Sequence, residues 1–273
     1  MIHSPVLPAT KDRAALTAPA HWRCIDVISD LHLQASLGAT LAAWRHYMTR
    51  TTADALFILG DLFEVWVGDD IIQGSGDPEG AFALQCQQIL KKTSTRLPVY
   101  FMHGNRDFLL GEDFAKACGM TLLADPTVLD FDHQRWLLSH GDALCLGDLD
   151  YQQFRQQVRS DAWRTAFLAK PLPERQAVAH GLRRQSEARK ASGATYADVD
   201  TAMARQWLEA AQASTLIHGH THHPADYVLS QVNDAPQRKR LVLSDWDADA
   251  KPPRLEVLRL HIGTAPTRVP ANT

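Results

Sequence analysis

The chain has 273 residues, of which 45% are hydrophobic, and its formal net charge is −3. This composition supports a substantial core, argues against disorder, and gives no global basic field for nucleic acid, so no nucleic-acid partner is expected. Four scattered cysteines without a CxxC pair indicate free thiols in a reducing, cytoplasmic compartment, and no apolar run approaches the roughly 20 residues that span a bilayer.

The amino-terminal segment and the first strand come next in chain order. Residues 1–20 contain three prolines and little periodicity, so we expect a loose extension followed by one domain over 21–273. An apolar, β-branched run at 25–28 predicts a buried strand that leads into Asp30 and His32. A carboxylate and an imidazole at a strand end suit a divalent metal, although a lone Asp-x-His is more often a cap or a solvated loop.

Four further apolar runs repeat this pattern, because each is expected to be a strand and each ends near a residue that can bind a metal. The runs cover 55–59, 99–102, 135–138 and 215–217. The residues that follow them are Asp61, Asn105, His140, His218 and His220. Ligands bind at the carboxyl edge of open α/β sheets, so we expect these side chains to lie close together.

The remaining segments are expected to be helices and closing strands of an α/β fold. The spacing of apolar residues predicts helices over 40–50, 80–92 and 198–212. Residues 121–133 are expected to form a β pair. Closing antiparallel strands are expected at 227–229, 241–243 and 255–258.

Residues 150–212 interrupt the alternation of strands and helices. One amphipathic helix is expected up to Pro171, with apolar positions that include Trp163 and Phe167, and a second helix is expected over 174–191. Between residues 155 and 190, nine lysines and arginines oppose three acidic residues. This excess is either a solvated helical face or a surface that attracts anionic headgroups.

The collected strand-end residues form a set of nitrogen and oxygen ligands without cysteine. Such a set suits a borderline-hard divalent ion, Mn²⁺ best, with Mg²⁺, Co²⁺ and Zn²⁺ as alternatives. Seven ligands exceed what one ion needs once water also binds, so two ions that share a bridging carboxylate are expected. Ion pairs of this kind clamp the attacking and leaving oxygens of a displacement at phosphorus.

These residues resemble the ordered motifs of the calcineurin-like metallophosphoesterases. The matching blocks are Asp30-Leu31-His32, Gly60-Asp61, Gly104-Asn105-Arg106-Asp107, His140 and Gly219-His220-Thr221-His222. The resemblance implies a sandwich of two mixed β-sheets flanked by helices. It also implies one metal on Asp30, His32 and His220, a second on Asn105, His140 and His218, and Asp61 as the bridge.

Longer stretches, at 60–70, 103–111 and 217–222, look like the UDP-2,3-diacylglucosamine pyrophosphatase family of lipid A biosynthesis, and the likeness covers about residues 24–260. It implies hydrolysis of UDP-2,3-diacylglucosamine to UMP and 2,3-diacylglucosamine 1-phosphate (lipid X), with two Mn²⁺ ions. It further implies a helical lid at about 148–195 over the acyl chains and peripheral contact with the cytoplasmic face of the inner membrane. No protein partner is expected.

The same resemblance assigns roles to individual residues. The implied catalytic residues are Asp61, Asn105, Arg106 and His140. The implied substrate contacts are Asn105, Arg106, Asp148, Ser186, Lys190 and His218, with Arg189 as an alternative to Lys190.

Two other functions stay open. A soluble metal-dependent phosphodiesterase or nucleotide phosphatase would not need an aromatic and basic helical cover. A docking scaffold without catalysis would lack a metal ligand, and the sequence lacks none.

Overall fold

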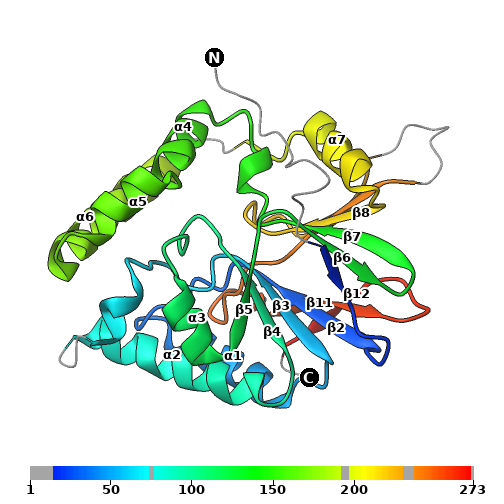
Figure 1. Cartoon of the computed structure of the whole chain (residues 1–273), viewed down its shortest axis with the longest axis horizontal. Helices are drawn as coiled ribbons and strands as arrows, with labels where there is room; N and C mark the ends of the chain where they lie inside the picture. The colour runs from blue at the N-terminus through cyan, green and yellow to red at the C-terminus, as the bar shows by residue number, and fades with distance from the viewer. Residues whose placement is uncertain (1–14, 74–76, 192–196, 230–236, 272–273) are drawn as a thin grey trace.

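The computed structural model describes residues 15–73, 77–191, 197–229 and 237–271 of the chain. Two mixed β-sheets of six strands each lie face to face (Figure 1). Sheet one has the order β12-β11-β2-β3-β4-β5, and β2 to β5 run parallel. Its strands are β2 (Cys24–Ile28), β3 (Ala55–Leu59), β4 (Val99–Met102), β5 (Met120–Leu123), β11 (Glu256–His261) and β12 (Thr267–Pro270).

Sheet two has the order β1-β6-β7-β8-β10-β9. Its central strands β7, β8 and β10 run parallel, while β6 and β9 pair antiparallel with their neighbours β7 and β10. Its strands are β1 (Ala15–Thr17), β6 (Thr127–Phe131), β7 (Gln134–Leu138), β8 (Thr215–His218), β9 (Ala225–Val228) and β10 (Lys239–Val242). The carboxyl ends of β7 and β8 therefore lie side by side.

Helices cover the outer faces of both sheets, which gives the α/β sandwich that the sequence predicts. Helices α1 (Gly38–Arg50), α2 (Pro78–Ser94) and α3 (Glu112–Cys118) lie against sheet one, and α7 (Thr201–Ala211) lies against sheet two. Two short 3₁₀ helices cover Asp69–Gln73 and Asp142–Leu144. Within the described residues, no helix combines the length and the apolarity that crossing a membrane requires.

Period-two alternation along the strands divides the apolar residues between two cores. In β3, Phe57 and Leu59 join the cluster between the sheets, while Leu56 and Ile58 join the cluster under the helices of sheet one. All five side chains of β3 are buried because both faces of the sheet are covered. A third cluster holds α7 on sheet two, through residues such as Trp207 and Leu208.

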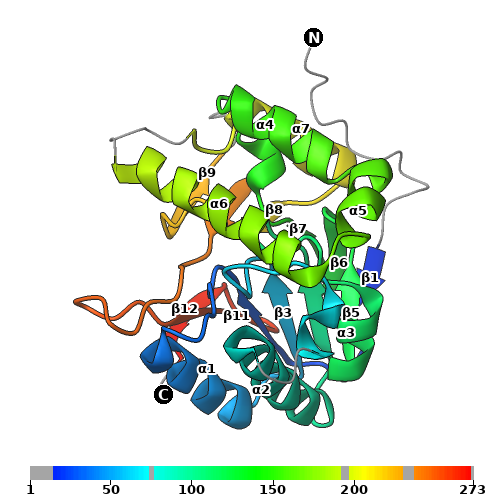
Figure 2. The ribbon, with the colours of Figure 1, turned by 90° about the vertical axis from the view of Figure 1, so that its left-hand side faces the viewer.

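The segment between β7 and α7 forms three helices, α4 (Leu149–Val158), α5 (Asp161–Leu168) and α6 (Leu172–Ala191). We call these three helices, residues 149–191, the insertion. Figure 2 shows α6 running across the carboxyl edge of sheet one. The single helix expected up to Pro171 is wrong, because α4 ends at Val158 and Ser160 caps a new helix, α5: its Oγ accepts a hydrogen bond from the Trp163 backbone N–H at 3.3 Å.

Three other expectations about strands need correction. The β pair expected within 121–133 is wrong, because β5 pairs with β4 in sheet one whereas β6 pairs with β7 in sheet two. The closing strands are antiparallel where β10 pairs with β9 and where β11 pairs with β2, but β10 also pairs in parallel with β8. Part of the expected extension is ordered, since Ala15–Thr17 form β1 and pair in parallel with β6; residues 1–14 lie outside the described residues. Alternation predicts which face a residue takes but not which strand it pairs with.

Candidate metal centre and active site

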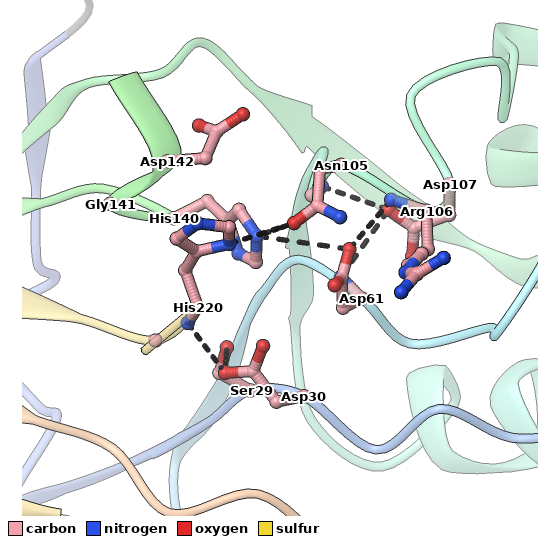
Figure 3. A network of polar contacts seen from close by, with 12 residues as sticks. Ser29, Asp30, Asp61, Asn105, Arg106, Asp107, His140, Gly141, Asp142 and His220 are labelled. Carbon is pink, nitrogen blue, oxygen red and sulfur yellow. Dashed lines mark hydrogen bonds and ion pairs between the residues drawn. The ribbon is translucent and has the colours of Figure 1, made fainter. Parts of the chain in front are cut away.

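The site forms where the carboxyl ends of five strands meet. The loops after β2, β3 and β4 come from sheet one, and the loops after β7 and β8 come from sheet two. They carry the seven residues that the sequence predicts as metal ligands: Asp30, His32, Asp61, Asn105, His140, His218 and His220. Figure 3 shows five of these, together with Arg106, around one centre. Direct contacts between these residues join the two sheets.

Asn105 and Asp61 hold one half of the centre. The Asn105 Oδ1 atom lies 3.0 Å from His140 Nε2 and 2.8 Å from His220 Nδ1, so one amide oxygen faces two imidazoles (Figure 3). The Asp61 Oδ1 atom lies 3.7 Å from His140 Nε2 and accepts a hydrogen bond from the Arg106 backbone N–H at 2.8 Å. These contacts bring the oxygens and nitrogens of the loops after β3, β4, β7 and β8 together at one point.

Asp30 and two histidines hold the other half. The His32 Nε2 atom lies 3.9 Å from Asp30 Oδ1 and 3.8 Å from Asp61 Oδ2, so Asp61 reaches both halves. His222 joins them, with its Nε2 atom 3.4 Å from Asp30 Oδ1 and 3.2 Å from His32 Nε2. Two groups with metal-binding geometry result, Asp30 with His32 and His222, and Asp30 with Asp61 and His140.

The electrostatics of the donor set fit a divalent cation. Burial lowers the pKa of His218 to about 4 and that of His220 to about 3, so both imidazoles are neutral and able to coordinate at pH 7. The His218 Nε2 atom is buried and has no hydrogen-bond partner in the described part of the chain. Burial disfavours charge on His140, but the carboxylates of Asp61 and Asp30 outweigh it and raise its pKa to about 9. A centre that attracts a proton this strongly also suits a cation.

The backbone at the site is in an unusual conformation. The residues Asp30, His32, Asp61, His220 and His222 all have left-handed φ values, between 48° and 67°. Such values are uncommon outside glycine and cluster at functional sites. Two glycines permit the close approach of the loops, because a Cβ on Gly104 would lie 2.1 Å from Asp61 Oδ1 and one on Gly219 would lie 2.0 Å from Ser29 Oγ.

Asp107 organises the loops from beneath. Its carboxylate accepts backbone hydrogen bonds from Leu62 at 2.7 Å, from Gly104 at 2.8 Å, and from Asp61 at 3.3 Å. Burial and the charge of Asp61 raise the pKa of Asp107 to about 7, whereas the backbone donors favour its ionised form. The Asp107 side chain thus joins the loops after β3 and β4.

The insertion contacts the site through a buried carboxylate that the sequence did not single out. Asp142 accepts hydrogen bonds from Tyr151 Oη at 2.6 Å and Arg155 Nε at 2.8 Å. Arg159 donates to the carbonyl oxygen of Gly104 at 2.8 Å and lies 3.4 Å from Asp142. Helix α4 is therefore tied to the loops that carry His140 and Asn105.

Several arginines of the insertion form ion pairs with carboxylates elsewhere in the protein. Arg175 is 2% exposed and pairs with Asp70 while donating to the carbonyl oxygen of Val67. Arg155 and Arg159 pair with Asp142. The solvated-face interpretation thus fails for these arginines, and Asp70 anchors α6 through Arg175.

The structure shows fewer contacts for the other residues that the sequence predicts to bind substrate. The Arg106 Nε atom is buried without a hydrogen-bond partner among the described residues. Asp148 caps α4, where its side chain accepts from the Tyr151 backbone N–H at 3.2 Å. Ser186, Arg189 and Lys190 belong to α6, but their side chains lie outside the described residues.

Sequence reasoning missed two side chains at the centre or underrated them. Glu64, which lies within the stretch 60–70, is 2.8 Å from the Nδ1 atom of His32. His222, the last residue of the final motif block, lies within the group formed by Asp30 and His32. Both follow a strand end within four or five residues, which was the available signal.

Comparison with known proteins decides the family. The family model described as "Calcineurin-like phosphoesterase" matches residues 25–224. The chain belongs to the calcineurin-like phosphoesterase family. This membership agrees with the two mixed sheets and with the five motif blocks at the strand ends.

Individual proteins are also similar to the chain. A protein of Bordetella pertussis named UDP-2,3-diacylglucosamine hydrolase is 43% identical over 83% of this chain and 87% of its own length. A protein of the same name from Chromobacterium violaceum is 46% identical over 81% of this chain and 90% of its own. Among solved structures, an archaeal phosphodiesterase aligns with 90% of this chain and 99% of its own, with 10% identity and a TM-score of 0.45.

Proposed function

We propose that this protein hydrolyses UDP-2,3-diacylglucosamine to UMP and 2,3-diacylglucosamine 1-phosphate (lipid X). One water is consumed as one P–O bond of the pyrophosphate breaks, which leaves two phosphate monoesters. The observation that carries the proposal is the 43–46% identity to proteins named for this substrate over more than four-fifths of the chain. All seven expected ligand residues lie at or just after the carboxyl ends of strands, which supports the proposal.

A pair of divalent ions, Mn²⁺ in our proposal, belongs at this centre. One ion would take Asp30, His32 and His220, the other would take Asn105, His140 and His218, and Asp61 would bridge. The bound ions supply Lewis-acid stabilisation of phosphoryl charge and activate the attacking water. The buried, unpartnered Nε2 atom of His218 supports this assignment. His222 is a further candidate ligand, because it lies within the Asp30 group.

The protein side chains would bind and orient the pyrophosphate. Arg106, whose buried Nε atom lacks a partner among the described residues, offers fixed positive charge to the leaving phosphate. That phosphate has a second pKa of about 6, so it departs without needing a proton from an acid. Asn105 would orient the substrate beside His140, which its amide oxygen already contacts at 3.0 Å.

The insertion would contribute the lid and the lipid contact. It carries exposed apolar side chains on all three helices, namely Leu149, Phe154, Leu168, Val178 and Leu182. Side chains of this kind can contact acyl chains, and Asp148, Ser186 and Lys190 are proposed to contact the head of the substrate. We further propose a cytoplasmic enzyme that binds peripherally to the inner membrane, where its substrate lies.

The direct test uses purified protein with Mn²⁺ and UDP-2,3-diacylglucosamine in detergent micelles. We expect UMP and the lipid monophosphate in equal amounts, and no release when EDTA is present. A soluble diester such as bis(p-nitrophenyl) phosphate serves as the comparison substrate. Faster cleavage of the soluble diester, with no UMP from the lipid, would replace the proposal with the soluble phosphodiesterase alternative.

A further inference from the structure

Glu64 has an unusual position, because one carboxylate contacts the metal centre, Arg106 and the insertion. Its side chain is 12% exposed. The Oε2 atom lies 2.8 Å from His32 Nδ1, while the Oε1 atom lies 3.5 Å from Arg183 Nε and 3.9 Å from Arg106 Nη1. The two oxygens of Glu64 therefore face two different parts of the site.

The backbone fixes this position. A parallel bridge joins Leu33 to Phe63, directly after the strands β2 and β3 end. The Leu33 N–H donates to the Leu62 carbonyl at 2.9 Å, and the Glu64 N–H donates to the Leu33 carbonyl at 3.2 Å. Because this isolated bridge and its backbone hydrogen bonds pair the loops after β2 and β3, they hold Glu64 beside His32.

The Oε2 atom determines which nitrogen of His32 faces the centre. A neutral imidazole has one N–H donor and one acceptor nitrogen, and a carboxylate accepts only. With Glu64 Oε2 2.8 Å from Nδ1, the tautomer that carries its proton on Nδ1 is favoured, which leaves the lone pair on Nε2, the atom that lies 3.9 Å from Asp30 Oδ1 and 3.8 Å from Asp61 Oδ2. Carboxylates that hold metal-binding histidines in this way typically change metal affinity by about 10–100-fold when removed.

The Oε1 atom connects the same carboxylate to α6. Arg183 also donates from Nη1 to Gln34 Oε1 at 2.8 Å, so the guanidinium spans the loop after β2 and the carboxylate after β3. Its side chain is 29% exposed, and this pair alone would contribute little to stability. Its placement brings a residue of the insertion within one carboxylate of His32 and of Arg106.

We propose that Glu64 is a positioning residue that couples the insertion to the metal centre. Through Oε2 it holds His32 for metal binding, and through Oε1 it holds Arg183 and Arg106 in the places where they meet substrate. The part of this inference that concerns substrate rests on the proposed function, whereas the part that concerns metal does not.

The metal part is tested without substrate, by titrating Mn²⁺ into the metal-free protein in a calorimeter. We expect Glu64→Ala to weaken one Mn²⁺ site by about 10–100-fold. Arg183→Gln should keep both Mn²⁺ affinities within about twofold of wild type, because Oε2 and His32 stay in place. Wild-type Mn²⁺ affinity in Glu64→Ala would overturn the metal part of the proposal, and an equal loss in Arg183→Gln would overturn the assignment of His32 positioning to Oε2 alone.

The substrate part is tested by a double-mutant cycle on KM with UDP-2,3-diacylglucosamine. Arg183→Gln and the shape-conserving Glu64→Gln should each raise KM at saturating Mn²⁺, and the double variant should be no worse than Glu64→Gln. Arg184→Gln, on the exposed neighbour of Arg183, is the matched control and should not change KM. Additive effects would refute the coupling.

The two experiments separate the inference from the proposed function. A wild-type protein that releases no UMP, but whose Glu64→Ala variant loses Mn²⁺, would refute the proposed function and support the metal part. If Glu64→Ala fails to fold, Glu64→Gln takes its place in the titration. The amide oxygen of Glu64→Gln can still accept a hydrogen bond from His32, so its Mn²⁺ affinity falls only if the amide turns away. The double-mutant cycle on KM then decides the proposal.

Discussion

The carboxylate of Asp107 offers the sharpest test of how the site is built. It accepts short hydrogen bonds from the backbone N–H groups of Leu62 and Gly104, at 2.7 and 2.8 Å, and longer ones from Asp61 and Phe63, at 3.3 and 3.4 Å. Replacing Asp107 by alanine removes the acceptor but leaves these donors in place. The side chain is fully buried, so water does not readily replace it.

The expected loss of stability follows from counting the short bonds. Each buried N–H left without a partner costs about 1–3 kcal/mol, so two of them cost about 2–6 kcal/mol. Removing the carboxylate also removes the burial cost that helps to raise the pKa of Asp107 to about 7, which offsets part of this loss. We therefore expect Asp107→Ala to lower the free energy of unfolding by about 2–4 kcal/mol, and Tm by about 5–15 °C.

The assay is denaturant unfolding of metal-free protein in EDTA, so that metal binding does not contribute to the stability. Asp113→Ala is the matched control, because Asp113 is exposed in the first turn of α3, and it should change stability by under about 1 kcal/mol. The Asp107 variant should also gain less Tm than wild type when Mn²⁺ is added. A loss below about 1 kcal/mol in Asp107→Ala would refute the reasoning, since unpaired buried donors would then cost nothing measurable.

Three other predictions concern activity. Asp61→Ala should lower kcat about a thousandfold or more by removing the bridging carboxylate, and EDTA should abolish turnover until Mn²⁺ is restored; activity within tenfold of wild type would contradict the bridge. Arg106→His should lose pyrophosphatase activity without becoming a good phosphomonoesterase, and strong monoesterase activity with an intact pyrophosphatase rate would count against fixed charge. Phe167→Ala, at a core position that is 6% exposed, should lower the free energy of unfolding by about 3–5 kcal/mol and should impair cleavage of acylated and de-acylated substrates alike. Phe154→Ala should raise KM for the acylated substrate alone. Equal KM changes on both substrates in Phe154→Ala would remove Phe154 from the lipid site.

The parts of the fold that sequence predicts best are those governed by local alternation. The strands expected over 55–59 and 99–102 have the same bounds as β3 and β4. Both are short, apolar and buried on both faces, and a ligand residue follows each. Because parallel neighbours end at the same edge, strand order did not have to be known to expect Asp61 and Asn105 together.

Sequence could not predict the contacts made by long side chains across the chain. Arg175 lies in a stretch that reads as an exposed basic helix, yet it is buried and pairs with Asp70, a residue 105 positions earlier. Trp163 and Phe167 read equally well as lipid contacts or as core. The structure places Phe167 in the core with Trp163 packed against it, which favours the second interpretation for this pair.

The left-handed backbone at the site shows why its ligands depend on the whole fold. A non-glycine residue in this conformation costs about 1–3 kcal/mol, so five of them together approach the net stability of a typical domain. Glycine would remove the strain but would also remove the carboxylates and imidazoles. The loops keep this shape because each follows a paired strand and is joined to its neighbour: the Asp30 N–H donates to the Gly60 carbonyl at 3.1 Å, and the His32 N–H donates to the Asp61 carbonyl at 3.0 Å. The core of the two sheets thus provides the energy that holds the ligands in place before any metal binds.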